Sequence, residues 1–277
     1  MALVINSNIA SINAQRNLSK TNNALSQTFQ RLASGLRVNS AKDDAAGLAI
    51  VTQLTKQIRG MNMGVRNAND TISMLQVAEG AMAETESAMQ RIRELAVQSA
   101  NGSYSDDDRL NLDAEVQQLI SEVERISQNT KFNGYELLGG TGGADFEGMF
   151  QVGAGSTDTL SITISAMTLA NLTLTGVAVS TSATAATALG SLDTGLSAIS
   201  TMRAKIGAYQ SRLESIIANA ENAMENTSAA RARIQDADIA VESANLTKNT
   251  ILQQAGVSVL AQANQQAAIT LKLLSGF

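Results

Sequence analysis

Residues 54–96 read LTKQIRGMNMGVRNANDTISMLQVAEGAMAETESAMQRIRELA, and every seventh residue of this stretch is apolar or small. The seven positions are Leu54, Met61, Ala68, Leu75, Met82, Met89 and Ala96. A partner stripe of Ile58, Val65 and Ile72 runs beside them until Glu79 and Glu86 take its next two places. A seven-residue apolar repeat is typical of coiled coils and helical bundles. We therefore expect one long helix over residues 44–100, ended by the Asn101-Gly102 turn.

The two ends of the chain carry the same kind of repeat on polar helices. Residues 6–34 place Leu18, Leu25 and Leu32 seven apart, with Asn22 and Phe29 at the companion positions and Leu36 continuing that stripe just beyond them. Near the other end, one stripe holds Val257, Asn264 and Leu271, and the second holds Leu260, Ala267 and Leu274. The predicted terminal seam consists of Leu18, Leu25, Phe29, Leu32, Val257, Leu260, Leu271 and Leu274. Because a seam this narrow buries too little surface to hold a helix alone, we expect the ends to pack on each other and on copies of the protein.

The middle of the chain changes character. Ser105 and Asp106 can cap a third helix that reaches about residue 129. Residues 133–190 are rich in Gly, Ser and Thr, and the alternations at 160–164 and 177–179 predict short strands. Helical periodicity returns from about Leu192, and Asp236 and Asp238 indicate a break before the last helix. The predicted fold is mainly α: a long antiparallel helical coiled coil or bundle built from both chain ends, with a small β-rich segment in the middle.

The composition argues against an enzyme. The 277 residues include no His, Cys, Pro or Trp. The absence of His removes the commonest general base and metal ligand, and the absence of Cys removes thiol chemistry and disulfides. Carboxylate-only, Ser–Lys or Mg²⁺ chemistry needs motifs that this sequence does not contain. We therefore expect a structural protein with no catalytic residue, metal or cofactor.

The charge is unevenly distributed. Residues 43–242 hold all 25 acidic residues but only 13 of the 20 basic ones, a net charge of −12, whereas both ends are sparsely basic. Because the terminal cations are spaced out and accompanied by few aromatics, we expect no nucleic-acid binding. No apolar run approaches the ~18 residues of a membrane span, and MALVINSN lacks the features of a secretory signal, so we expect no membrane insertion.

Several long runs resemble bacterial flagellins. They are NSNIASINAQRNL (6–18), RLASGLRVNSAKDDAAGLAI (31–50), QRIRELAVQSANG (90–102), KFNGYELL (131–138), FQVGAG (150–155) and DADIAVESANLTKNTILQQAGVSVLAQANQ (236–265). The resemblance covers nearly all of residues 1–155 and 195–277, so the chain looks like a short flagellin with little or no variable outer domain.

The resemblance implies an arrangement of segments. Residues 1–42 and 236–277 would be the two halves of an inner coiled-coil domain that lines the channel of the filament. Residues 43–130 and 191–235 would be the N-terminal helices and the C-terminal helix of a rod domain, and 131–190 its β-rich segment.

The resemblance also implies partners and location. The chain would polymerise with copies of itself, and it would meet a filament cap protein, a hook-junction protein and a flagellin export chaperone. It would leave the cell through the flagellar type III apparatus and form an extracellular filament, or a periplasmic one if it comes from a spirochete. Flagellins recognised by host Toll-like receptor 5 carry a patch that corresponds here to Gln90, Arg91, Leu95 and Glu115.

Two other functions are considered. A flagellin-like protein of the hook–filament junction would also be helical and would also bind through its helices, although the long matches at 31–50 and 90–102 favour the filament subunit. An enzyme inserted into a flagellin scaffold is disfavoured, because the middle segment is short and lacks His and Cys.

Overall fold

The computed structural model describes residues 7–139 and 143–275 and is mainly helical, which confirms the predicted fold class. The elements are, in order, α1 (Ile9–Ser34), α2 (Ala45–Ala100), α3 (Asp106–Asn129), β1 (Lys131–Phe132), β2 (Tyr135–Glu136), β3 (Phe146–Gln151), β4 (Thr159–Ile164), α4 (Ser182–Gln235) and α5 (Ile239–Ser275). The expected long second helix, the third helix and the break before the last helix are all present. The chain contains no proline, so no missing backbone N–H of a proline interrupts the hydrogen bonds of α2 or α4.

The chain divides into two compact units. The terminal unit comprises Met1–Lys56 and Asn226–Phe277, and the central unit comprises Gln57–Glu225. The boundaries fall inside α2 and α4, so each of these long helices contributes to both units. The segment boundaries expected from the sequence lie elsewhere: 42/43 falls in the connector between α1 and α2, and 235/236 falls at the end of α4.

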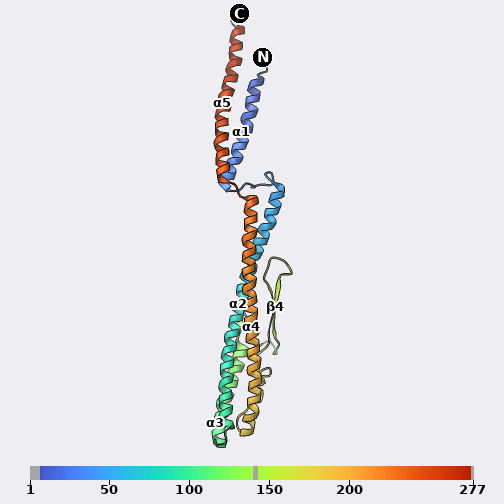
Figure 1. The fold of residues 1–277 in the computed structure, drawn as a ribbon, viewed down its shortest axis with the longest axis vertical. Helices are drawn as coiled ribbons and strands as arrows, with labels where there is room; N and C mark the ends of the chain where they lie inside the picture. Colours follow the sequence, from blue (N-terminus) through green and yellow to red (C-terminus); the bar gives the residue numbers. More distant parts are fainter. Residues whose placement is uncertain (1–6, 140–142, 276–277) are drawn as a thin grey trace. The chain divides into compact units, whose positions relative to one another are not determined.

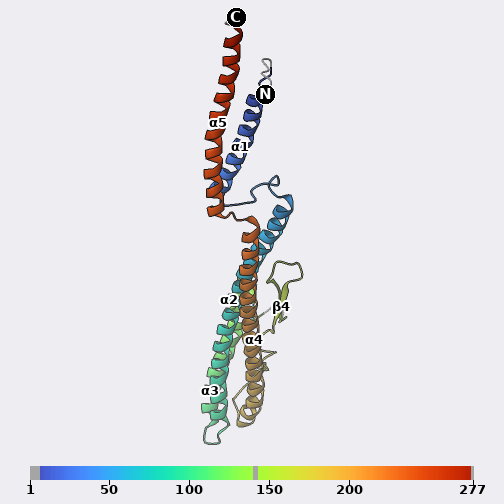
Figure 2. The same ribbon diagram turned by 45° about the horizontal axis from the view of Figure 1, so that its top comes forward.

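In the terminal unit, α1 and α5 run antiparallel and side by side (Figures 1 and 2). Asn8 caps the start of α1 by accepting a hydrogen bond from Ser11 N, and Gly35 ends it in the left-handed region with φ 70°. The connectors then meet: Leu36 and Asp236 form an antiparallel β-bridge, and Ala237 N donates to Gly35 O at 2.9 Å. The base of the helix pair is therefore joined through the backbone.

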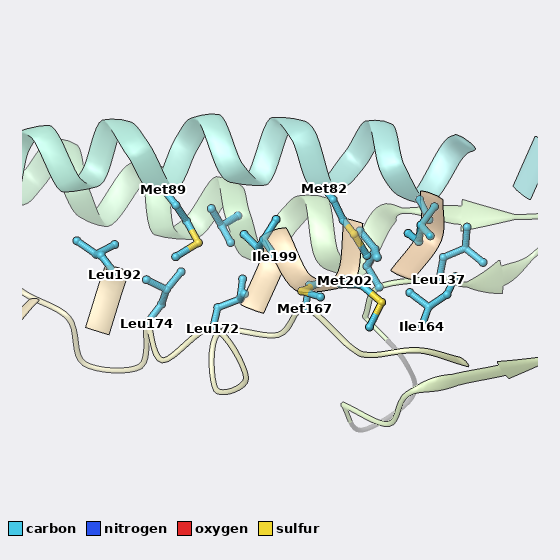
Figure 3. Packing of buried hydrophobic residues seen from close by; sticks show 14 of the residues in the cluster. Met82, Met89, Leu137, Ile164, Met167, Leu172, Leu174, Leu192, Ile199 and Met202 are labelled. Carbon is cyan, nitrogen blue, oxygen red and sulfur yellow. The ribbon is translucent and has the colours of Figure 1, made fainter. Parts of the chain in front are cut away.

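The core of the central unit lies between α2, α3, α4 and the loop that precedes α4. The seven positions of the apolar repeat on α2, from Leu54 to Ala96, are all buried except Leu54, which is half-buried. Figure 3 shows Met82 and Met89 of α2 among residues of α4 and of the loop, including Leu192, Ile199, Met202, Met167, Leu172 and Leu174. Glu86 pairs with Arg203, and Glu79 accepts a hydrogen bond from Gln210, so these acids link α2 to α4.

The β-rich segment contains two antiparallel pairs. The strands β1 and β2 flank Asn133-Gly134, whose positive φ values of 49° and 85° suit a tight hairpin turn. The strands β3 and β4 pair from Phe146–Ile164 to Gln151–Thr159, which confirms the alternation at 160–164. The strand expected at Val177 and Val179 is absent: both side chains are buried, but the backbone bonds side chains instead of a neighbouring strand. Gln117 donates to Val177 O, and Val179 N donates to Asp113 Oδ1.

The helix α4 begins ten residues before Leu192, at Ser182. Residues 182–191 are mainly Ala, Ser and Thr, and Leu189 is their one bulky apolar side chain, so no repeat of such side chains makes helical periodicity visible in the sequence. Ala185 and Ala188 are nevertheless buried on the face that continues to Leu192.

Candidate functional site

The contact between α1 and α5 is made of small and polar side chains. The buried residues of α1 are Ser11, Ala14 and Thr28, and among the side chains described on α5 the buried ones are Glu242 and Ala263. Short side chains allow the two helices to approach closely. Gly256 of α5 lies against Leu18, since a Cβ built there would be 4.0 Å from Leu18 Cβ.

The predicted seam residues fall into three groups. Leu18, Leu25, Leu32 and Leu260 are half-buried in the terminal unit. Phe29 and Val257 are instead 54% and 52% exposed. On α1 the buried companion positions are Ala14 and Thr28, one residue before the Asn22–Phe29–Leu36 stripe, because the narrow contact selects short side chains rather than the ring. Leu271 and Leu274 lie outside the residues whose side chains are described.

Sequence reasoning placed Asn22 and Asn264 on the stripes of the two terminal helices but missed the other polar residues of this contact. Arg31 Nη1 donates to Glu242 Oε1 at 3.0 Å, Gln253 Nε2 donates to Asn22 Oδ1 at 2.8 Å, and Ser11 Oγ donates to Asn264 Oδ1 at 2.9 Å. A search for apolar repeats passes over such residues. The available signal was that Glu242 is the last acid of the chain and stands in the first turn of a helix.

The helix α5 also exposes many large apolar side chains. Seven of them have exposed fractions between 47% and 59%: Ile239, Val241, Ile251, Leu252, Val257, Val259 and Ile269. Their spacing places them on more than one face of α5, outside the face that meets α1. Exposed apolar surface of this extent is typical of a surface that packs against another protein.

The four residues of the predicted recognition patch lie on α2 and α3 of the central unit. Arg91 Nε and Nη2 donate to Glu115 Oε1 at 3.1 and 3.0 Å, and Arg91 Nη1 donates to Glu94. These bonds, first to Glu115 and then to Glu94, raise the pKa of Arg91. Gln90 is exposed and donates to Glu86 at 3.4 Å. Leu95 is only 1% exposed and belongs to the core, so the accessible part of the patch consists of Gln90, Arg91 and Glu115.

The described ranges, 7–139 and 143–275, contain neither a candidate membrane span nor a metal-binding cluster. No helix there contains a stretch long and apolar enough to cross a membrane. No group of three or more Asp and Glu side chains in these ranges is arranged to hold a metal ion.

Comparison with known proteins identifies relatives over nearly the whole length. The family model of the bacterial flagellin N-terminal helical region matches residues 5–142, and that of the C-terminal helical region matches residues 189–274. The 31.3 kDa flagellar filament core protein of Treponema maltophilum is 40% identical over 98% of this chain and 100% of its own length. The flagellin of Halalkalibacterium halodurans is 42% identical with the same two coverages. A candidate flagellar hook-associated protein of Vibrio parahaemolyticus has a TM-score of 0.59 over 70% of this chain and 100% of its own, but at 14% identity this likeness concerns the fold alone.

Proposed function

Since the chain belongs to the bacterial flagellin family and is a structural subunit of the flagellar filament rather than an enzyme, we propose that its paired helices α1 and α5 line the filament's central channel. The observation that carries the proposal is the pairing itself. The two chain ends meet through a shallow polar contact, and large apolar side chains stay exposed along α5. In a polymer, neighbouring copies would cover these side chains, and the gain in buried apolar area would stabilise the pair.

The test is electron microscopy of the purified protein under polymerising conditions. We expect filaments whose reconstruction places α1 and α5 at the innermost radius. Filaments with these helices at the outer surface would overturn the channel assignment. Short rings or capped structures in place of filaments would favour the protein of the hook–filament junction.

For location, we propose secretion through the flagellar export apparatus, with an export chaperone holding the chain before export and the cap and hook-junction proteins meeting it at the two ends of the filament. The T. maltophilum and H. halodurans proteins match this chain equally well along their whole length, so the comparison does not choose between an external and a periplasmic filament. Immunogold labelling of intact and of outer-membrane-stripped cells distinguishes the two. Labelling of intact cells supports an extracellular filament, and labelling only after stripping supports a periplasmic one.

We also propose that the free subunit presents Gln90, Arg91 and Glu115 to Toll-like receptor 5, with Leu95 holding α2 in place beneath them. The two ion pairs of Arg91 keep its guanidinium at the surface between α2 and α3. A receptor reporter assay on the monomer tests this with Arg91→Ala, which should lower potency about tenfold, as expected for one lost charged contact.

The matched control for that assay is Arg93→Ala. Arg93 stands two residues away on the same helix, is similarly exposed and pairs with Asp193 of α4. Its loss should leave receptor potency unchanged. Full signalling by Arg91→Ala, or equal losses in both variants, would contradict the proposed patch.

A further inference from the structure

Arg31 and Glu242 form the one ion pair that the structure describes within the terminal unit. We propose that this pair determines the axial register in which α1 and α5 align, and thereby which faces of both helices are left for neighbouring copies of the chain. The inference deepens the proposed function and rests on the pairing of the chain ends in the filament.

The rest of the contact specifies register weakly. The residues of α1 that face α5 repeat every seven positions, and so do those of α5 that face α1. On α1 one stripe holds Ser11, Leu18, Leu25 and Leu32, and a second holds the buried Ala14 and Thr28; on α5 the facing stripe holds Glu242, Asn249, Gly256 and Ala263. A slip of one heptad, about 10 Å along a helix, replaces one leucine by another against small residues. Packing alone therefore distinguishes neighbouring registers poorly.

The neutral polar contacts add little discrimination. Gln253 and Asn22 belong to an exposed contact, the bond from Ser11 to Asn264 is partly buried but joins two neutral groups, and both helices are rich in Asn, Gln and Ser. After a slip, each amide would find water or another amide, so few hydrogen bonds would be lost.

Glu242 differs from all of these, because it is 7% exposed and carries a charge. It lies in the first turn of α5, and Arg31 lies in the last turn of α1, so each charge has the sign that its helix end favours. A one-heptad slip would place Glu242 opposite Ala24 and separate it from Arg31. A buried carboxylate without its partner is strongly disfavoured, so the slipped register is rejected.

Holding Arg31 beside Glu242 also has an energetic cost. Arg31 Nε is buried and has no hydrogen-bond partner, so the guanidinium is held beside Glu242 with one donor unused. A buried ion pair adds little net stability, and in some coiled coils a single buried polar residue sets the register. The backbone bridge between Leu36 and Asp236 joins the connectors, and Arg31 and Glu242 lie just beyond it, one on each helix.

Disulfide trapping in assembled filaments tests the inference, because the natural chain has no cysteine to interfere. The native-register probe is Leu18→Cys with Gly256→Cys, whose Cβ positions, 4.0 Å apart, suit a disulfide. The slipped-register probe is Leu18→Cys with Asn249→Cys, because the slip that places Glu242 opposite Ala24 also brings residue 249 to the position of residue 256 opposite Leu18. Each probe chain is diluted about twentyfold into unmodified subunits, so that cross-links form within one chain by mass action, and mass spectrometry identifies them.

We expect only the native probe to cross-link in otherwise unaltered chains. In an Arg31→Met, Glu242→Met background, which removes both charges, the ratio of slipped to native product should rise at least about tenfold. The charge exchange Arg31→Glu, Glu242→Arg should restore the native ratio. Gln253→Met, which removes a neutral contact of the same helix pair, is the control and should leave the ratio unchanged.

The outcomes distinguish an error in the proposed pairing of α1 and α5 from an error in the role of the ion pair. If unaltered chains form filaments without the native cross-link, the pairing of α1 and α5 in the filament is wrong, and the inference falls with it. If the native cross-link forms but the ratio is the same in the Met–Met background, the connector bridge is sufficient, and the inference alone is overturned.

Discussion

Gly195 of α4 lies directly against the backbone of Leu172: a Cβ built on Gly195 would be 2.5 Å from the carbonyl oxygen of Leu172. The same Cβ would also meet Met89 Cε, but a methionine end can move, whereas the loop backbone is held by buried neighbours such as Leu174. Glycine is therefore required for α4 to approach the loop of residues 165–181 in the central unit.

Gly195→Ala should destabilise the protein. We expect a loss of about 1–3 kcal/mol, because the added methyl group forces the helix and the loop apart. Thermal or urea unfolding of the monomer measures it. Gly190→Ala is the matched control on the same helix: a Cβ there meets nothing within 4 Å. That substitution should stabilise α4 by up to about 1 kcal/mol through helix propensity. Equal effects of the two substitutions would contradict the close approach.

Leu95→Ala should also lower stability, by about 2–5 kcal/mol, since it removes a fully buried side chain and leaves a cavity. Leu110→Ala on α3 is the control, because Leu110 is 57% exposed and its loss should cost less than about 0.5 kcal/mol. The result bears on the receptor patch, because any reduced signalling by Leu95→Ala must be compared with its loss of folded protein. A Leu95 variant of unchanged stability would show that the side chain is not in the core.

The start of α3 should weaken in acid through Asp108. Asp108 Oδ2 accepts hydrogen bonds from Ser105 Oγ at 2.7 Å and Ser105 N at 3.1 Å, in that order of importance, and they lower the pKa of Asp108 below 3.8. Because the folded-state pKa is depressed, the contribution to stability is full above about pH 3.8, the unfolded value, and is lost as the pH falls through the folded pKa.

The measurement is the melting temperature of the monomer between pH 7 and pH 3. Asp108→Asn should lower it at pH 7, and the difference from the natural protein should shrink as the pH falls below about 3.8. Asp107→Asn removes an equal charge from the same helix turn but lies outside the capping box, so it corrects for the helix dipole. If the difference in melting temperature between Asp108→Asn and the natural protein stayed constant with pH, the ionised carboxylate of Asp108 would not be what stabilises the start of α3.

The sequence predicted the helices best where large apolar side chains recur on a broad face. The apolar repeat from Met61 to Ala96 is buried as expected, because the central unit packs several elements against α2. The start of α4 could not be located, because alanines such as Ala185 and Ala188 pack well but look alike on every face. Val177 and Val179 have strand-like alternation, yet Gln117 and Asp113 supply their hydrogen bonds, and no local pattern predicts a partner 60 residues away.

The candidate site was harder to predict than the fold. The heptad rule identified Leu18, Leu25, Leu32 and Leu260, but it assigned Phe29 to a companion stripe that Ala14 and Thr28 occupy in the structure. The rule assumes that the bulkiest side chains face the partner helix. In a pair whose outer faces are also apolar, the closest contact uses the smallest residues, and the larger ones are free for other contacts.

Phe29 and Val257 should therefore matter for assembly and not for the fold of the subunit. Both are about half exposed, so Phe29→Ser with Val257→Ser should change monomer stability by less than about 0.5 kcal/mol. If neighbouring copies bury them in the filament, each side chain contributes up to about 1.5–3 kcal/mol to association. The critical concentration for polymerisation should then rise at least about tenfold.

Sedimentation of filaments over a range of subunit concentrations measures this critical concentration. The control is Asn17→Ser with Gln262→Ser, which changes exposed polar residues of the same helices and should leave the critical concentration unaltered. An unchanged critical concentration in the Phe29–Val257 variant would show that neighbouring copies do not bury these two side chains.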